Sequence, residues 1–265
     1  MFLGDSLTEG VGSKRISHVS ELAKLLRASE FRLRPIDTLN GYVEFNVAGL
    51  MQQQAASDLW LWNLACEGKT IESDFEWLQL ISALRPELVV VFRGSLESII
   101  RPAMLFDNQW PWWVPRSWRT YSAMDPRCYF STTWWRKAKQ TSVDALKQKA
   151  RLKLLKLRSG KALMELEKFA QYERELLQQL RTLAPRVLVM GLLPVADTRF
   201  PNSPAYFKSV NTKLKKIADG AGVEFYDWGS FLPEKGTHDE LFYRDGFHPN
   251  AAGARALAEI LAQRL

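Results

Sequence analysis

Cysteine and histidine are scarce in this chain, and their scarcity excludes several kinds of site. The two cysteines, Cys66 and Cys128, lie far apart and show no CxxC spacing, which favours neither a zinc site nor a disulfide framework. The three histidines, His18, His238 and His248, are too scattered to indicate a metal cluster. The sequence therefore predicts no metal site.

Long apolar runs are also lacking. No run approaches the roughly 18 residues expected of a transmembrane helix, and no basic stretch followed by an apolar one indicates a signal peptide at the N-terminus. A cytoplasmic location is the default expectation. The chain opens inside what reads as its first strand, which raises the question of whether further residues precede it.

What the chain does have suits a globular protein. Apolar residues make up 46% of its 265 residues and charged residues 25%, enough for a sizeable core and an ordinary charged surface. The length fits one α/β domain with an insertion. The net charge of +7 and the pI of about 9.4 favour anionic partners and carry no information about the fold.

Short apolar runs typical of buried strands alternate along the chain with amphipathic helix patterns. The strand-like runs are 1–4, 41–50, 58–65, 86–95, 186–194 and 223–229. The helical patterns are 18–29, the second part of 66–84, 168–185, 203–222 and 250–265. This alternation predicts a parallel sheet covered by helices on both faces, with ligands bound beyond the carboxyl ends of the strands.

Residues 98–165 break the alternation. The stretch 98–142 holds six of the ten tryptophans, and 136–161 holds ten Lys and Arg residues with Asp144 as its single acid. We interpret 98–165 as an insertion, a cap or side lobe within a single domain of 1–265. Its basic part predicts a long helix that leads into the helix of 168–185.

Two motifs at opposite ends of the chain could carry chemistry. In the first, a strand ends in the Gly4-Asp5-Ser6 turn, which can present a serine hydroxyl at the top of a sheet. In the second, Asp245 precedes His248 by three residues in a tight loop. An aspartate at that offset can orient an imidazole and leave its Nε2 free as a base. A serine and an Asp/His pair are the components of acyl transfer.

Gly4-Asp5-Ser6-Leu7, the Asn63…Gly68 loop and Asp245-Gly246-Phe247-His248-Pro249 together resemble the GDSL, or SGNH, hydrolase family. The resemblance covers roughly 1–97 and 168–265 and omits the insertion. It implies a flavodoxin-like three-layer α/β/α sandwich around a parallel sheet (the SGNH hydrolase fold), hydrolysis of esters or thioesters, and no cofactor or metal.

The same resemblance assigns roles to individual residues. Ser6 would be the nucleophile, His248 the base and Asp245 its orienting partner, while the backbone N–H groups of Ser6 and Gly68 would form the oxyanion hole. Glycine suits position 68 because it allows the backbone to come close to the substrate oxygen.

The chain departs from the family at the third oxyanion donor. The family has an Asn in a Gly-x-Asn-Asp stretch, and this chain has Leu96 there, in Gly94-Ser95-Leu96-Glu97. Loss of one such donor typically costs about 10²–10³ in rate. Another group could replace it, with Arg93, Ser95 and Arg101 as candidates, or the enzyme could be slow, or the site could serve binding alone. We favour replacement; for Arg93, pairing with a nearby acid such as Glu97 is an equal alternative.

Simpler interpretations stay open for each feature. Ser6 could cap a helix, Asp245 and His248 could be ordinary turn residues, and Gly68 an ordinary loop glycine. The tryptophans could form a binding lid or a small apolar core. For the basic helix we favour a solvated face with one packed side over an anionic lipid surface or nucleic acid.

The sequence thus predicts a serine ester hydrolase with a Ser-His-Asp triad and an acyl-enzyme. The favoured substrate is a small acyl ester, such as an acetyl group on a carbohydrate. The alternatives are a lipid esterase of the lysophospholipase or thioesterase type, and a non-catalytic carbohydrate- or membrane-binding module that kept the fold.

Overall fold

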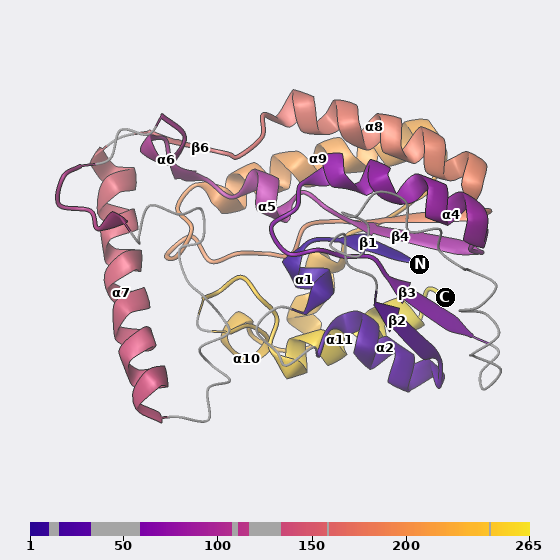
Figure 1. The fold of residues 1–265 in the computed structure, drawn as a ribbon, viewed down its shortest axis with the longest axis horizontal. Helices are drawn as coiled ribbons and strands as arrows, with labels where there is room; N and C mark the ends of the chain where they lie inside the picture. Colours follow the sequence, from indigo (N-terminus) through magenta and orange to yellow (C-terminus); the bar gives the residue numbers. More distant parts are fainter. Residues whose placement is uncertain (11–15, 33–58, 108–110, 117–133, 158, 244) are drawn as a thin grey trace.

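A six-stranded parallel sheet forms the centre of the computed structural model (Figure 1). The structure describes residues 1–265 except 11–15, 33–58, 108–110, 117–133, 158 and 244. In spatial order the strands are β2 (Ser29–Arg32), β3 (Trp60–Asn63), β1 (Phe2–Gly4), β4 (Leu88–Phe92), β7 (Arg186–Met190) and β8 (Glu224–Tyr226). All five pairings between neighbouring strands are parallel.

Helices cover the sheet on both faces. The helices α2 (His18–Leu26) and α11 (Ala251–Ala262) pack together on one face, and α4 (Leu78–Leu84), α8 (Leu166–Leu183) and α9 (Ser203–Ala221) cover the other (Figure 1). In α8 the buried residues Phe169, Glu173, Leu176 and Leu180 recur every three or four positions, so a single side of the helix faces the sheet. The flavodoxin-like α/β/α sandwich predicted from the sequence is confirmed.

Most of the expected elements are present. The strand runs at 1–4, 58–65, 86–95, 186–194 and 223–229 each contain a strand, and the predicted helices differ from the observed ones mainly at their ends. The edge strand β2 was not predicted, and the strand expected at 41–50 lies outside the described residues. The remaining short elements are α1 (Ser6–Glu9), α5 (Ser95–Ser98), α10 (His238–Leu241) and the 3₁₀ turns Ile71–Trp77, Trp228–Ser230 and Leu232–Glu234.

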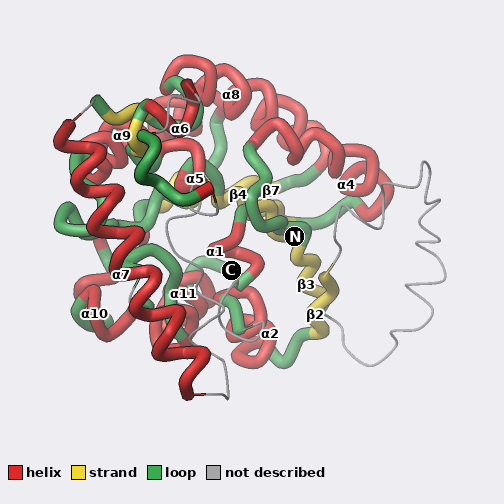
Figure 2. Tube along the Cα trace, turned by 60° about the vertical axis from the view of Figure 1, so that its left-hand side comes forward, coloured by secondary structure: helices red, strands yellow, loops and turns green. Residues whose placement is uncertain are grey.

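The described part of 98–165, the stretch interpreted above as an insertion, stands beside the sheet (Figure 2). It contains β5 (Arg101–Pro102), α6 (Met104–Asp107), the long helix α7 (Trp134–Leu157) and β6 (Gly160–Lys161), which pairs antiparallel with β5. The basic helix therefore ends at Leu157 and does not run into α8 as the sequence suggested. The β5–β6 ladder turns the chain back toward the main sheet before α8 begins.

A small apolar cluster supports the insertion. Met104, Val114 and Leu154 are buried together, apart from the main core. Not all leucines of α7 are buried: Leu146 and Leu157 are more than half exposed. The sequence predicts one packed side for this helix. Leu154 is buried and Leu152 and Leu155 are half-buried, so that side is packed only in part. Within the described residues, no helix is both long and apolar enough to cross a membrane.

Candidate active site

Ser6 lies at the carboxyl end of β1, an interior strand of the sheet. β1 ends at Gly4, and a Cβ at Gly4 would collide with the side chain of Thr8, so only glycine allows this turn. Asp5 then caps α1, because its Oδ1 accepts a hydrogen bond from the Leu7 N–H at 2.9 Å. Ser6 is the first residue of α1, where backbone N–H groups have no acceptor within the helix.

The loop 243–249 holds His248 at the same edge of the sheet. The Asp245 Oδ1 accepts the backbone N–H groups of Phe247 and His248, at 2.9 and 3.0 Å. Gly246 adopts a φ of 67°, a left-handed conformation that suits glycine, and its N–H donates to Tyr243 O. Because these hydrogen bonds lie within the loop, the residue types of Asp-Gly-x-His determine its conformation.

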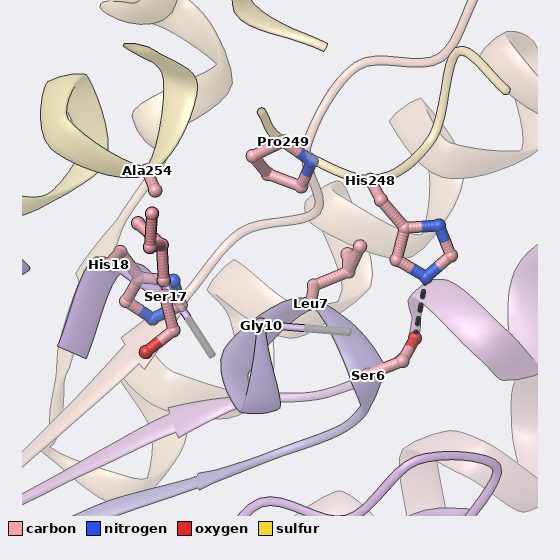
Figure 3. A pocket seen from close by; sticks show the side chains of 9 residues that line it. Ser6, Leu7, Gly10, Ser17, His18, His248, Pro249 and Ala254 are labelled. Atoms are coloured by element: carbon pink, nitrogen blue, oxygen red, sulfur yellow. Dashed lines mark hydrogen bonds between the residues drawn. The ribbon is translucent and has the colours of Figure 1, made fainter. Parts of the chain in front are cut away.

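The structure brings Ser6, His248 and Asp245 into one row, although Ser6 and His248 are 242 positions apart in sequence. Ser6 Oγ lies 3.0 Å from His248 Nε2 (Figure 3), and His248 Nδ1 lies 2.7 Å from Asp245 Oδ2. Asp245 is buried, while Ser6 and His248 are partly exposed. Burial works to raise the pKa of Asp245, but the hydrogen bonds from the His248 ring and from two backbone N–H groups hold it below its ordinary value.

A cavity of about 10 Å³ lies beside the Ser6–His248 pair (Figure 3). Its lining comes from α1, from the start of α2 and from Pro249 and Ala254. A space of this volume holds at most about one water molecule. This space is too small for an ester substrate.

The loop between β3 and the 3₁₀ turn carries Gly68. After β3 the chain continues alongside β1, with Leu64 N donating to Phe2 O and Cys66 N donating to Gly4 O. This pairing leads the loop toward the turn that holds Ser6. Gly68 is exposed and has a φ of 72°, and a Cβ built there would have nothing within 4 Å. Backbone conformation, and not lack of space, is what favours glycine at this position.

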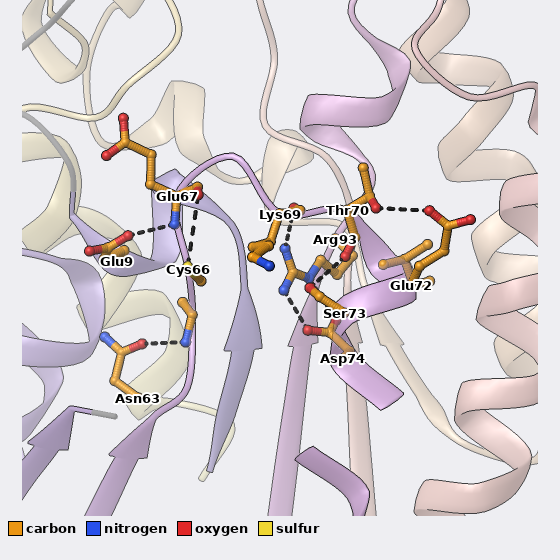
Figure 4. A network of polar contacts seen from close by, with 12 residues as sticks. Glu9, Asn63, Cys66, Glu67, Lys69, Thr70, Glu72, Ser73, Asp74 and Arg93 are labelled. Atoms are coloured by element: carbon orange, nitrogen blue, oxygen red, sulfur yellow. Dashed lines mark hydrogen bonds and ion pairs between the residues drawn. The ribbon is translucent and has the colours of Figure 1, made fainter. Parts of the chain in front are cut away.

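Three side chains hold this loop on both sides of Gly68: Glu9, which is partly buried, and Arg93 and Glu97, which are buried. Figure 4 shows the first two. Before it, the Glu9 carboxylate accepts the Glu67 N–H at 2.6 Å. After it, Arg93 donates to Lys69 O at 2.8 Å, and the Glu97 carboxyl accepts the Ile71 N–H at 2.8 Å. The sequence did not indicate Glu9 for this role, because its distance of 58 positions from Glu67 leaves no local pattern.

Arg93 is anchored by Asp74. Its Nε donates to Asp74 Oδ2 at 2.6 Å, its Nη2 donates to Asp74 Oδ1, and both side chains are almost completely buried. The alternative that Arg93 pairs with a nearby acid is therefore confirmed, but the acid is Asp74, and Glu97 interacts with Arg93 through its charge. Burial raises the pKa of Glu97 to about 7, and the Arg93 charge opposes that rise.

The three side chains considered as substitutes for the missing Asn donor are all buried. Arg93 is bound to Asp74 and Lys69, and the Arg101 Nη1 donates to Leu96 O and Ile99 O at 2.8 and 3.1 Å. Ser95 is 1% exposed, and its hydroxyl has no hydrogen-bond partner among the described residues. The two arginines are therefore held by other acceptors, and Leu96 itself is half-buried in α5.

The other two histidines do not join the row. His18 is enclosed by the rings of Phe2, Phe92 and Trp228, and burial lowers its pKa to about 3. His238 stacks on Phe242 at the start of α10, with 4.3 Å between the ring centres, and is partly buried.

Comparisons with known proteins point to one family. Residues 162–256 match the model of the GDSL-like Lipase/Acylhydrolase family. That range includes Asp245 and His248 and excludes Ser6 and Gly68. No curated protein sequence matches the chain.

Solved structures resemble the whole chain at low sequence identity. An acetyl xylan esterase, AlAXEase, is 14% identical with a TM-score of 0.54 and full coverage of both chains. Axe2, an acetylxylan esterase from Geobacillus stearothermophilus, is 14% identical with a TM-score of 0.51, covering 99% of this chain and 91% of its own. TesA is 16% identical with a TM-score of 0.53, covering 99% and 94%. At identities this low, the structural similarity shows a shared fold alone.

Proposed function

We propose that this chain is an ester hydrolase of the GDSL-like lipase/acylhydrolase type and that it works through an acyl-enzyme on Ser6. The observation that supports this proposal most directly is the row of two hydrogen bonds from Ser6 Oγ through the His248 ring to Asp245. A serine hydroxyl is a weak nucleophile, and a neighbouring base that is itself oriented by a third group is what activates it.

The ionised Asp245 sets the direction of the proton transfer. Its carboxylate accepts the Nδ1–H of His248, which leaves Nε2 without a proton and able to accept the one on Ser6 Oγ. As Ser6 Oγ bonds to the ester carbonyl carbon, its proton moves to Nε2. The imidazolium then gives that proton to the leaving alcohol as the C–O bond breaks.

Water completes the cycle. His248 takes a proton from the water while the water oxygen attacks the acyl carbon, and the proton returns to Ser6 Oγ as the acid leaves. No metal or cofactor has a part in these steps.

The oxyanion that forms in each half-reaction would be held by two backbone N–H groups, those of Ser6 and Gly68. Ser6 N lies at the first turn of α1, where donors point outward. Glu9, Arg93 and Glu97 hold the loop on either side of Gly68. With Leu96 in place of an amide donor, a rigid Gly68 loop would be what keeps a two-donor hole effective.

A small acyl ester, such as an acetyl group on a carbohydrate, is the substrate class we favour. Two of the similar structures are described as acetylxylan esterases, which supports this choice. A lipid esterase is the second candidate, favoured by the exposed tryptophans Trp112 and Trp134 of the insertion. A binding module that kept the fold would explain Leu96 but leaves the Ser6–His248 bond without a purpose.

The test is hydrolysis of p-nitrophenyl esters of increasing chain length, together with labelling by a fluorophosphonate. We expect the unaltered protein to cleave the acetyl ester best and to be labelled, and Ser6→Ala to lose both properties. Ser209→Ala, an exposed serine on α9, is the matched control and should behave as the unaltered protein. Labelling that survives in Ser6→Ala, or a folded unaltered protein that is neither active nor labelled, would refute the proposal. A preference for long chains would select the lipid esterase.

A further inference from the structure

The helix α7 is oriented with polar residues on its buried side. Asp144 and Arg151 are 2% and 8% exposed, and they lie on the same side as the buried Leu154. Arg151 donates to Ile100 O at 2.9 Å, and its guanidinium lies 5.0 Å from the centre of the Phe200 ring. Polar contacts, and not an apolar stripe, therefore fix most of this helix to the domain.

The opposite side of α7 carries apolar and basic residues together. Trp134, Trp135, Leu146 and Leu157 are 79%, 51%, 55% and 64% exposed. At ~100° per residue they fall within an arc of about 140° on the helix. The same arc holds four exposed lysines: Lys139, Lys149, Lys153 and Lys156. The only acid of the helix, Asp144, is on the buried side, so this face carries only positive charge.

Two further tryptophans join this face. The Lys153 Nζ lies 5.8 Å from the centre of the Trp113 ring, and the neighbouring Trp112 is 91% exposed. Lys153 follows Trp134 by 19 positions, which corresponds to about 28 Å along a helix. Exposed tryptophans therefore occur near both ends of α7. The eight α7 residues of this arc, together with Trp112 and Trp113, make up the α7 face.

We propose that the α7 face binds the surface of an anionic phospholipid bilayer. Tryptophan rings prefer the boundary between lipid headgroups and acyl chains, and lysines bind anionic headgroups while their alkyl stems cover apolar surface. A helix that faces only water gains no stability from aromatic rings exposed to this degree, and exposed apolar patches are typical of binding surfaces. Nucleic acid would match the lysines, but it would leave Leu146 and Leu157 without a partner.

The contacts of α7 link this helix to the edge of the sheet where Ser6 lies. On α7, Gln148 donates to Arg199 O at 2.5 Å. The Arg199 side chain lies against Gly246, in the loop that carries His248, at a distance where any Cβ would collide with it. Gln148 lies outside the arc of the α7 face, so these contacts join the domain-facing side of α7 to the loop of His248 and leave the α7 face free for a bilayer.

Sedimentation with vesicles tests the inference without using the enzyme's activity. The vesicles are phosphatidylcholine alone and phosphatidylcholine mixed with phosphatidylglycerol. The unaltered protein should bind the mixed vesicles, release them as salt is raised, and bind the neutral ones far less. Each lysine near an anionic surface contributes about fivefold in affinity, so Lys149→Gln/Lys153→Gln/Lys156→Gln should weaken binding roughly 100-fold. The matched control removes the same charge on α9, with Lys208→Gln/Lys215→Gln/Lys216→Gln, and should weaken binding much less.

A second variant separates the tryptophans from the charge. Trp134→Ala/Trp135→Ala keeps every lysine and should also lose most of the vesicle binding while keeping the circular dichroism spectrum of the unaltered protein. Equal weakening by the α7 and α9 triple variants would overturn the inference, because vesicle binding would then depend on the net charge of the protein alone. So would binding to duplex DNA without binding to mixed vesicles, and so would full binding by the tryptophan variant. Failure of the Ser6 tests would leave these vesicle results unaffected.

Discussion

Replacing Glu173 by glutamine should change how the stability of the protein depends on pH. Glu173 lies in the middle of α8 with 0% exposure, and neither carboxyl oxygen has a hydrogen-bond partner among the described residues. Burial raises its pKa from 4.5 to about 8, and the nearby charges of Asp74 and Glu97 add to this effect. The carboxyl is therefore protonated in the folded protein at neutral pH.

The sign of the effect follows from which state loses the proton first. The unfolded chain releases the Glu173 proton above pH 4.5, whereas the folded protein keeps it until about pH 8. The contribution to stability is complete below pH 4.5 and falls as the pH rises toward 8. At ~1.4 kcal/mol for each pH unit, the loss from this group is about 5 kcal/mol.

Urea unfolding from pH 4.5 to 8.5 measures this loss. Glutamine has no proton to release, so the free energy of unfolding of Glu173→Gln, minus that of the unaltered protein, should rise by about 5 kcal/mol across the range and level off above pH 8. The free-energy cost of burying the glutamine amide is the same at every pH, so it does not affect how the difference changes with pH. Glu175→Gln, an exposed position on the same helix, is the control and should give a much smaller slope. A flat difference for Glu173→Gln would show that its carboxyl titrates normally in the folded protein, and the reasoning would be refuted.

Two further predictions concern the site. Asp245→Asn should keep the loop 243–249 folded, because its amide oxygen can still accept the two backbone N–H groups, but kcat should fall about 10⁴-fold since the His248 ring loses its orienting carboxylate. A fall of less than tenfold in steady-state p-nitrophenyl acetate hydrolysis would contradict this role. Glu9→Ala should lower kcat about tenfold with little change in KM, because the Glu67 N–H loses a carboxylate acceptor worth ~1.5 kcal/mol or more and the Gly68 loop loosens. Glu21→Ala, which breaks only a surface pair with Lys24, is its control. Equal kcat values for the two variants would show that Glu9 does not hold the Gly68 loop in place.

Local sequence was sufficient wherever a structure depends on close neighbours in the chain. The turn at Gly4 and the loop from Asp245 to His248 are fixed by contacts within four positions, so their conformations follow from the residue types. The alternation of apolar runs and amphipathic patterns likewise predicted the layered sheet, because each pattern reports which side of an element must be buried. The edge strand β2 escaped because Ser29–Arg32 has no apolar run.

Only the tertiary structure decided which distant groups meet. Ser6 and His248 are brought to 3.0 Å by a sheet that places both loops at one edge. The buried Arg93 pairs with Asp74, 19 positions away, and not with Glu97, four positions away. A buried guanidinium needs an acceptor with the right geometry, and closeness in sequence does not provide it. The side of α7 that faces solvent was decided in the same way. Its polar residues found partners on the domain, which left its tryptophans outside, against what hydrophobicity alone predicts.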